Sequence, residues 1–292
     1  MIKVSLYIPC FNAENYIKEC LESIFMQSYP LDEVLIIDDG STDNTVSICS
    51  RFPVKIINHE KNRGLAVVRN TAFRAARNEF VASLDADCKA RPDWLERLMK
   101  HFSDQNIIGV GGKLIEKYNL RMADKWRAVH MSQSWGDQII ENPGYLAGNN
   151  IVYRRSAIFQ VGLYNETYVR NYEDIDISKR LMSNGLKIIY SPDACVEHLR
   201  RDTIGNALKT YWHWGFHNFN KPDTLKQLLL KAKSNYIVSR LFLRQDIKAR
   251  NRSLLFPDMI LFFYYCWLDL CYYINHKFKS FFPSETFLRR KR

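Results

Sequence analysis

The sequence predicts an α/β fold: a mostly parallel, Rossmann-like central sheet flanked by helices, with a helical extension at the C-terminus. Up to about residue 110, short apolar runs without polar alternation are separated by amphipathic stretches of helical period. Strands of that composition are typical of parallel sheets that helices cover on both faces. We expect strands at Val4–Ile8, Val34–Ile37, Val54–Ile57 and Phe80–Leu84, and helices at about 14–27, 43–50, 64–77 and 92–102.

Beyond about residue 110 the pattern loosens. Helical pieces are expected around 120–135, and a helix at about 173–184 ends at Asn184-Gly185, a favourable C-cap. The run Leu186–Tyr190 and the stretch that ends at His198 indicate a last strand and its exit. We therefore divide the chain into a catalytic domain at 1–205 and a helical extension at 206–292.

Composition and cysteine usage favour a reducing compartment. Apolar residues make up 47% of the 292 residues, which is enough for a sizeable core. The seven cysteines are odd in number and contain no C-x-x-C pair, so a disulfide framework or a zinc site is not expected. The segment Met1–Leu6 has the pattern of a first strand and not of a signal peptide, so we expect a cytoplasmic protein.

The net charge of +11 is concentrated at one end of the chain. Residues 200–292 contain 18 Lys and Arg against 6 Asp and Glu, whereas residues 1–199 contain 24 against 25. A basic tail on a neutral domain is typical of a protein that meets an anionic surface. We therefore expect contact with an anionic membrane surface. A nucleic-acid-binding module, which charge alone would also suggest, leaves the acidic motifs described below unexplained.

The extension itself combines basic and aromatic residues. Apolar positions in 224–252 recur at helical spacing beside Lys and Arg, and Leu254–Ile274 is strongly apolar. Only ten residues lie between Asp258 and Asp269, about 15 Å of helix, against a bilayer core of about 30 Å. We expect this segment to lie in the membrane interface. The alternatives are a helical pair packed on the catalytic domain and an interface in a homodimer.

Pairs of acids follow two of the expected strands. Asp38 and Asp39 end the second strand, and Asp85-Ala86-Asp87 ends the fourth. Because ligands gather at the carboxyl ends of such strands, these acids are placed to meet one. Adjacent like charges cost free energy unless something binds them, and an Asp-x-Asp motif can direct two carboxylates at Mg²⁺ or Mn²⁺. Asp43, farther along, is expected to cap a helix.

Three further motifs carry candidate chemistry. Asn62-Arg63-Gly64 with Arg69 opens a helix, where backbone N–H groups and an arginine suit a phosphate or ribose. Glu173 and Asp174 begin another helix, and one of its acids can serve as a general base. His198 follows the last strand, where a structural role and metal binding are both open.

Together and in this order, the motifs resemble those of the family 2 glycosyltransferases, which have the GT-A fold. The similarity extends over the first 200 residues or so. It comprises Val4–Asn12, Glu14 and Tyr16, Gln27–Pro30, Asp38–Asp43, Asn62–Gly64, Arg69-Asn70, Asp85–Asp87 and Glu173-Asp174.

The resemblance implies a role for each matching position. Asp174 resembles the catalytic base, and Asp87 with His198 would hold Mn²⁺ or Mg²⁺. The donor-binding positions would be Pro9 and Phe11 at the nucleoside, Asp39 at the base, Asn62, Gly64 and Arg69 at the ribose and diphosphate, and Asp85 at the ribose or a metal-bound water. Loops at the donor sugar and acceptor would contain Gly111, Gly112, Gly148 and Asn149, with Glu173 beside the base.

The implied activity is inverting transfer of one sugar from a nucleotide sugar, with UDP-sugars favoured, to a glycan or lipid-linked acceptor. Processive members carry a Gln-x-x-Arg-Trp motif, but the corresponding region here is Lys209–Gly215 without it. The tail suggests cell-surface or lipid-linked glycan assembly by a peripheral protein on the inner face of the membrane. The alternative is a sugar-phosphate nucleotidyltransferase, although the Gly-rich loop expected of that class is replaced by Pro9–Asn12.

Overall fold

The computed structural model describes residues 2–168, 171–216 and 222–278, which belong to two compact units. The sheet unit comprises Met1–Asn119 and Arg127–Arg201, and the helical unit comprises Leu120–Trp126 and Asp202–Arg292. The division differs from the predicted boundary at 205/206 in two respects. The second unit begins a few residues earlier, and it also includes a short segment from the middle of the chain.

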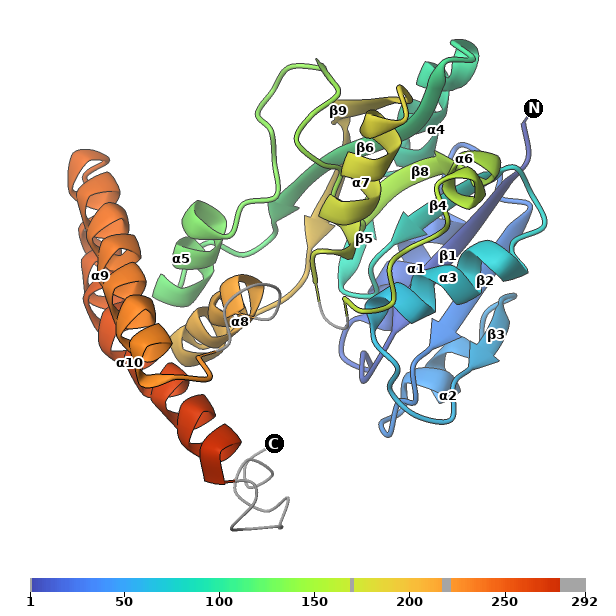
Figure 1. Cartoon of the computed structure of the whole chain (residues 1–292). Helices are drawn as coiled ribbons and strands as arrows, with labels where there is room; N and C mark the ends of the chain where they lie inside the picture. Colours follow the sequence, from blue (N-terminus) through green and yellow to red (C-terminus); the bar gives the residue numbers. More distant parts are fainter. Residues whose placement is uncertain (1, 169–170, 217–221, 279–292) are drawn as a thin grey trace. The chain divides into compact units, whose positions relative to one another are not determined.

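A nine-stranded sheet organises the sheet unit (Figure 1), and its first half is parallel as predicted. Each of the four predicted strands forms, within one or two residues of its expected bounds. The order across this half is β3 (Lys55–Asn58), β2 (Glu33–Asp38), β1 (Val4–Cys10) and β4 (Phe80–Leu84). All three strand pairs in this half are parallel.

The second half makes the sheet mixed. β8 (Asn150–Arg154) runs antiparallel to both β4 and β6 (Ile107–Glu116), whereas β6 pairs in parallel with β9 (Lys187–His198). The sheet ends with the short strand β5 (Cys88–Ala90), and β7 (Ile140–Glu141) pairs with β9. β9 is a single strand that contains both the predicted last strand and its exit.

Helices and apolar side chains cover both faces of the sheet. Alternation along β1 sends Leu6 and Ile8 into one apolar layer and Tyr7 into the other. Helices α1 and α4 contribute to the first layer, and α3, α6 and α7 to the second. The helices of this part of the chain are α1 (Ile17–Phe25), α2 (Thr45–Cys49), α3 (Leu65–Ala75), α4 (Trp94–Met99), α5 (Met122–His130), α6 (Arg155–Gln160) and α7 (Glu173–Ser183).

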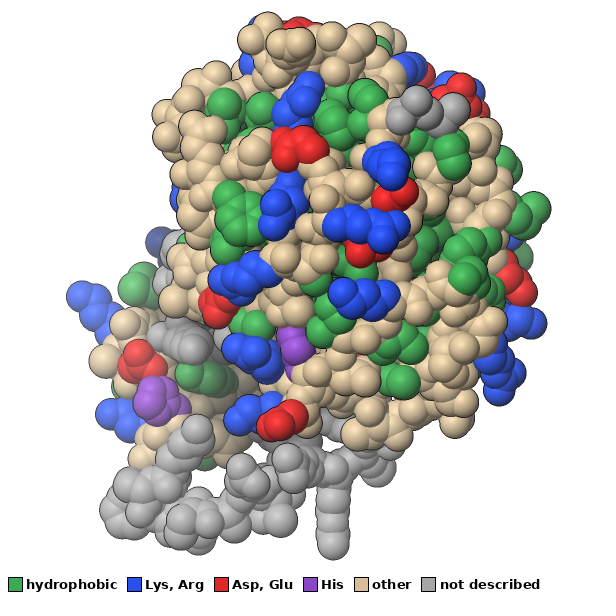
Figure 2. Space-filling view, turned by 90° about the vertical axis from the view of Figure 1, so that its right-hand side faces the viewer, with side chains coloured by type: hydrophobic (Ala, Val, Ile, Leu, Met, Phe, Trp, Pro, Cys, Tyr) green, Lys and Arg blue, Asp and Glu red, His purple; other side chains and the backbone are tan. Residues whose placement is uncertain are grey.

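Charge on the sheet unit is evenly mixed. On the face that Figure 2 presents, basic, acidic and apolar side chains are interspersed. This agrees with the near-equal numbers of basic and acidic residues in positions 1–199. All seven cysteines are free thiols, and five of them are buried in the sheet unit, as expected for small apolar residues.

Gly111 and Gly112 lie inside β6, which corrects the prediction that they belong to loops around the donor sugar and acceptor. A Cβ atom on Gly111 would come within 2.9 Å of Leu146. At Gly112 it would lie 1.9 Å from the backbone oxygen of Ala194 and 2.6 Å from the Asn150 side chain. Glycine is therefore needed at Gly112 because neighbouring backbone approaches too closely for any side chain.

Replacing Gly112 by alanine should lower the free energy of unfolding by about 1–3 kcal/mol, the usual cost of overpacking a closely packed site. Chemical denaturation followed by circular dichroism would measure this. Gly205→Ala is the matched control, because nothing lies within 4 Å of a Cβ there. Equal stability of the two variants would show that β6 tolerates a side chain at Gly112.

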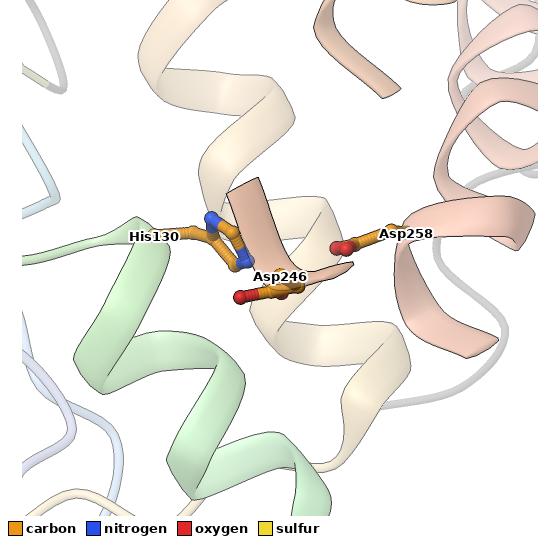
Figure 3. A group of neighbouring side chains, drawn as sticks. All are labelled: His130, Asp246 and Asp258. Atoms are coloured by element: carbon orange, nitrogen blue, oxygen red, sulfur yellow. The ribbon is translucent and has the colours of Figure 1, made fainter. Parts of the chain in front are cut away.

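The helical unit contains α8 (Ile204–Phe216), α9 (Leu225–Lys248) and α10 (Leu255–Phe278). A capping box between Thr224 and Gln227 starts α9. The interior of the helical unit contains buried polar groups. The Asp258 carboxylate accepts a hydrogen bond from the Trp126 indole at 2.9 Å. Asp246 and Asp258 have carboxylate oxygens within 4.8 Å of each other (Figure 3). Burial, with the nearby Asp246 carboxyl, raises the pKa of Asp258 to about 7.

One helix in the described part of the chain has the length and hydropathy of a membrane-crossing helix. It extends over Arg252–Lys277, with a mean hydropathy of 1.5 and 33% of its most apolar window buried. Length and composition are all that this test measures. The helix continues through Asp258 and Asp269, which bound the ten uninterrupted residues, and both of these acids are buried.

Candidate active site

The carboxyl ends of β1, β2 and β4 lie side by side, as the parallel pairing requires. Cys10 at the end of β1 is paired with Asp38 at the end of β2, and Tyr7 with Ser83 near the end of β4. The residues that follow these strands therefore emerge at one edge of the sheet. They include Phe11, Asp39 and Asp85, each of which the sequence assigned to the site.

Asp39 binds the loop that precedes α3. Its carboxylate accepts hydrogen bonds from the backbone N–H groups of Arg63 and Gly64 at 2.9–3.0 Å and contacts the His59 ring at 2.7 Å. These hydrogen bonds offset the repulsion expected between Asp38 and Asp39, because backbone N–H dipoles stabilise the negative charge of Asp39. Asp39 thus holds the 62–64 loop in place, and its contact with a nucleotide base stays a prediction.

The neighbouring turn is built from polar contacts. Asn12 has a positive φ of 51°; its side-chain oxygen accepts a hydrogen bond from Thr42 N, and its backbone N–H donates to Ser41 Oγ. Asp43 accepts from the backbone N–H groups of Glu14 and Thr45, although the N-cap of α2 is Asn44. The turn therefore fixes how the chain leaves β1 and β2.

Two predicted donor contacts remain accessible at this edge. The Phe11 side chain is 42% exposed, and Asn62 is exposed beside Gly64, which has a φ of 94° and stands at the N-cap of α3. Pro9 is half-buried within β1. An exposed aromatic ring at the end of a parallel strand suits a flat base, and the first N–H groups of α3 suit an anion.

Arg69 is a buried structural centre, which corrects the prediction that it contacts the ribose or diphosphate. It is 2% exposed. Its Nη1 donates to Tyr7 Oη at 3.0 Å, Ser83 Oγ at 3.1 Å and the Gly148 carbonyl at 2.9 Å, and its Nε donates to Glu173 at 3.2 Å. The guanidinium therefore ties β1, β4, the loop before β8 and the start of α7 together beneath the site.

Glu173 and Gly148 belong to this buried network. Glu173 is 2% exposed and pairs with Arg69, so it supports the site from below. This corrects the prediction that it borders a sugar. A Cβ on Gly148 would lie 2.4 Å from Arg69 Nη2, so glycine lets the arginine approach the backbone. The neighbouring Asn149 is buried, and its side-chain oxygen has no hydrogen-bond partner among the described residues.

Asp174 has the environment of a general base. Its carboxylate accepts a hydrogen bond from Gly148 N at 3.4 Å and another from Ile175 N at 2.8 Å. Burial raises the pKa of Asp174 to about 7, and the adjacent charge of Glu173 adds to the rise. Tyr172, immediately before this pair, has a φ of 81°, an uncommon conformation for a bulky residue and one that clusters at functional sites.

Asp85 links Arg69 to the Asp-x-Asp motif. Its Oδ1 lies 3.8 Å from Arg69 Nη2 and has no hydrogen-bond partner among the described residues. Burial raises the pKa of Asp85 to about 6, although the Arg69 charge opposes the rise. The side chain is still 30% exposed. Oδ1 is buried against Arg69, so only the exposed part of this carboxylate can meet a polar ligand at this edge of the sheet.

Asp87 and His198, the two predicted metal ligands, lie in direct contact. Their Oδ2 and Nε2 atoms are 3.3 Å apart, and the other ring nitrogen of His198 contacts Glu116 at 2.9 Å. Burial works against a charged imidazole, but the carboxylates of Asp87 and Glu116 raise the pKa of His198 to about 9. The charge and hydrogen bond of His198 in turn lower the pKa of Asp87 against the effect of burial.

Sequence reasoning missed Glu116 and Arg127. Glu116 ends β6 directly opposite His198 in β9, and Arg127 donates to the Glu116 carboxylate at 3.0 Å. A carboxylate on the far nitrogen of a metal-binding histidine fixes the ring and its tautomer. Only the pairing register of β6 with β9 shows this contact, because no local motif surrounds Glu116.

Comparison with known proteins places this site in a family. A model of glycosyl transferase family 2 matches residues 5–162, which include the acids at 38–39 and 85–87 but not Asp174 or His198. The pre-mycofactocin glycosyltransferase of Mycobacterium tuberculosis is 33% identical over 184 residues, which cover 59% of this chain and 38% of that protein. The chain thus spans well under half the length of this relative.

Solved structures show the same fold at low sequence identity. S. aureus TarS 1-349, in complex with UDP-GlcNAc, superposes with a TM-score of 0.54 at 20% identity, over 73% of this chain and 65% of that one. Mannosyltransferase PcManGT from Pyrobaculum calidifontis, in complex with GDP-Man and Mn²⁺, gives 0.58 at 18% identity, over 91% and 86%. With its family model matching more than half of its length on a GT-A fold, the chain belongs to glycosyl transferase family 2.

Proposed function

We propose that this protein transfers one sugar from a nucleoside diphosphate sugar to an acceptor hydroxyl, with inversion at the anomeric carbon. The observation that carries the proposal is the state of Asp174. It is a half-buried carboxylate that accepts a hydrogen bond from the Gly148 N–H, and its pKa is raised to about 7. A base works best when its pKa lies near the operating pH, and a structural acid on a helix start needs no such shift.

The chemistry follows from one base and one displacement. Asp174 accepts the proton of the acceptor hydroxyl while that oxygen bonds to the anomeric carbon and the bond to the diphosphate breaks. A single attack from the face opposite the leaving group inverts the carbon. Arg69 and Glu173 hold the base beneath the site, because Glu173 precedes Asp174 in α7 and pairs with the buried guanidinium.

The donor is placed at the carboxyl edge of β1, β2 and β4. Phe11 offers an exposed ring to the base, and Asn62 is exposed in the loop that Asp39 holds through the N–H groups of Arg63 and Gly64. Both solved structures described above contain nucleotide sugars, one with UDP and one with GDP. We favour a UDP-sugar as the donor.

The residues present fit Mn²⁺ or Mg²⁺. Asp87 Oδ2 and His198 Nε2 are close enough to share an ion, Glu116 contacts the opposite ring nitrogen, and the partly exposed Asp85 belongs to the same motif. Carboxylate ligands suit both Mn²⁺ and Mg²⁺. When bound, the ion would offset the charge that develops on the departing diphosphate.

Replacing Glu116 by glutamine should weaken Mn²⁺ binding about 10–100-fold, because an outer carboxylate that orients a histidine is lost. Isothermal titration with MnCl₂ in the absence of donor measures this directly. Glu197, which is partly exposed on the same strand as His198, supplies the control variant Glu197→Gln. Equal affinities of the two variants would remove Glu116 from the proposed ion site.

The acceptor and location follow from the basic tail. Lipid-linked or cell-surface glycan precursors are assembled where a soluble donor meets a membrane, and residues 200–292 hold the whole excess of positive charge. We place the protein in the cytoplasm, at the inner face of the membrane, acting in polysaccharide biosynthesis. A homodimer stays compatible with this placement.

Donor hydrolysis and transfer across UDP-, GDP- and dTDP-sugars, with Mn²⁺ or Mg²⁺, tests the proposal. Release of nucleoside diphosphate with at least one donor, lost on chelation of the metal, is the expected result. Release of pyrophosphate from a nucleoside triphosphate and a sugar phosphate would instead support a nucleotidyltransferase. Inversion is checked by the anomeric configuration of the isolated product, and a retained configuration would overturn the single displacement.

A further inference from the structure

The outer face of α10 is apolar along its whole length. Six large apolar side chains recur three or four residues apart and all remain exposed, with Phe263 at 71% and Trp267 at 61%. Helices on the surface of soluble proteins normally present polar residues outward. The outer stripe, as we name it, consists of Phe256, Met259, Phe263, Trp267, Leu270 and Ile274.

The acids of α10 point the other way, into the helical unit. Asp269 accepts hydrogen bonds from the Trp212 indole at 3.0 Å and from Asn235 Nδ2 at 2.7 Å. Asp258 accepts from the Trp126 indole, and its backbone oxygen accepts from Ser239 Oγ at 2.5 Å. Helix α10 therefore turns its two acids inward and a row of large apolar side chains outward, which is unusual for a helix at a surface in water.

An aromatic seam joins the outer stripe to basic residues on α9. The Tyr236 ring meets Phe262 with centroids 6.0 Å apart, and Phe262 meets Phe263 of the stripe at 5.1 Å. Lys233 and Arg240 lie on α9 about one turn to either side of Tyr236, and both are exposed. Cations thus border the apolar surface on the side of α9.

From this arrangement we infer that the outer face of the α9–α10 hairpin binds an anionic lipid surface and lies in its plane. The outer stripe enters the boundary between headgroups and acyl chains, and Lys233 and Arg240 meet lipid phosphates. Aromatic rings with a polar edge, such as Tyr236 and Trp267, belong at headgroup depth. The inference deepens the membrane placement proposed above by naming the contact surface and its orientation.

A membrane-crossing orientation conflicts with α9. The two helices pack together along their length and are joined by a short turn, so a crossing α10 would draw α9 with it. Lys233 and Arg240 are exposed near the middle of α9 and would then face acyl chains. Each would cost about 2.5–3.5 kcal/mol there, whereas the in-plane orientation leaves both at the phosphates.

A second copy of the chain is a poorer occupant of this face. In a two-fold interface the same patch meets itself, so each basic border would approach its own equivalent. The exposed cations of α9 also include Lys226, Arg244 and Lys248, whereas exposed acids are absent from the described residues of α9. Like charges would oppose such a dimer, and the same charges favour an anionic leaflet.

Flotation of the full chain with vesicles of phosphatidylcholine, alone or mixed with phosphatidylglycerol, tests the inference. Phe263→Gln and Trp267→Gln should each weaken binding roughly tenfold, because a large buried side chain is lost. Lys233→Gln and Arg240→Gln should each weaken it about fivefold, and only with the anionic lipid. Met26→Gln, at a side chain of the sheet unit that is 70% exposed, is the control and should bind as the unchanged chain does.

Unchanged binding of the Phe263 and Trp267 variants would overturn the inference. The inference would also be overturned if these variants lost self-association, measured by light scattering, but bound vesicles as before. That result would assign the face to a second copy of the chain. Donor hydrolysis in solution should be the same for all these variants, because none lies in the sheet unit's site. Failure of vesicle binding with intact hydrolysis therefore separates this inference from the proposed transferase activity.

Orientation is tested with single cysteines at the two ends of α10. Ser253→Cys and Asn275→Cys are made in a chain whose Cys266 and Cys271 are replaced by serine, since the other five thiols are buried. With protein added outside sealed vesicles, a membrane-impermeant maleimide should label both positions. Protection of only one end would show that α10 crosses the membrane and would overturn the in-plane orientation.

Discussion

Asp174→Asn is expected to reduce transfer about 10²–10⁴-fold, the usual contribution of a positioned general base. The amide retains the size of the carboxylate but cannot accept the proton of the acceptor. The proposed donor position is at Phe11 and the 62–64 loop, so the dissociation constant for the nucleoside diphosphate should change little. Steady-state kinetics and isothermal titration of the same preparation measure the two quantities.

Asp176→Asn is the matched control for this prediction. Asp176 stands two residues along α7, where it pairs with Arg180 at 2.7–2.8 Å and points away from the Gly148 N–H. Its loss should leave the rate within about twofold, because a partly exposed helix pair is worth little. Equal inactivation of the two variants, or loss of nucleotide binding in Asp174→Asn, would mean that the base is misassigned.

The same residue sets the expected pH dependence. Burial, with the charge of Glu173, raises the pKa of Asp174 to about 7, so the base is increasingly protonated below that pH. The rate constant kcat/KM should therefore rise with pH and level off above about pH 7. Glu173→Gln should move this limb to lower pH, because it removes the neighbouring charge while the amide oxygen still accepts from Arg69 Nε. A limb that does not move would exclude Asp174 as its source.

The raised pKa also has a consequence for stability, in the opposite direction. The folded pKa of Asp174 lies above the value of about 3.9 expected for an unfolded chain. Between these values the folded state binds more protons, so its stability falls as the pH rises. Asp174→Asn removes that dependence, and its thermal midpoint at pH 8 should equal or exceed that of the unchanged chain. An inactive variant that is also unstable would point to misfolding.

Local sequence signals predicted the parallel half of the sheet well. Apolar runs without alternation identify β1, β2 and β4, because a strand buried on both faces needs apolar residues at every position, and a shorter run identifies the edge strand β3. Glycine and asparagine after α7 predicted where that helix ends, and Gly185 indeed has a φ of 73°. Such features depend on neighbours in the chain, so they can be seen without the fold.

The parts that the sequence did not predict depend on contacts between distant residues. β8 enters antiparallel between β4 and β6, and nothing in its own five residues states that direction. Glu116 meets His198 only through the register of β6 and β9. The family resemblance assigned Gly112 to a loop, whereas here glycine allows close backbone contact within a strand.

Arg69 shows both a local sequence signal and the effect of contacts with distant residues. A basic residue one turn into a helix that follows a glycine suggests an anion-binding contact, and sequence alone offers no reason to bury it. The fold surrounds it with four acceptors from separate segments: Tyr7, Ser83, the Gly148 carbonyl and Glu173. The position of the guanidinium is therefore set by residues up to 104 positions away in the chain. The expected role of Arg69 changes from binding the nucleotide sugar to supporting the site.

Arg69→Met is accordingly expected to cost about 3–5 kcal/mol of unfolding free energy, because it leaves Glu173 as an uncompensated buried charge. Methionine retains much of the volume, so the loss of charge and hydrogen bonds dominates. Urea denaturation measures the change, and transfer should fall with it, since Asp174 and the Gly148 loop lose their common anchor. Arg69→Lys should recover little, because one ammonium group cannot reach these acceptors in a planar fork.

Arg74→Met on the same helix is the control for Arg69→Met. Arg74 is 55% exposed and lies 3.8 Å from Glu166, so its loss should cost less than about 1 kcal/mol. Adding Glu173→Gln to Arg69→Met should restore part of the lost stability, because the remaining buried carboxylate is neutralised and the two positions are coupled. Two results would contradict the assignment of the guanidinium as the charge that holds α7 and its base in place. One is an equal loss of unfolding free energy in Arg69→Met and Arg74→Met. The other is a lower unfolding free energy in the double variant than in Arg69→Met alone.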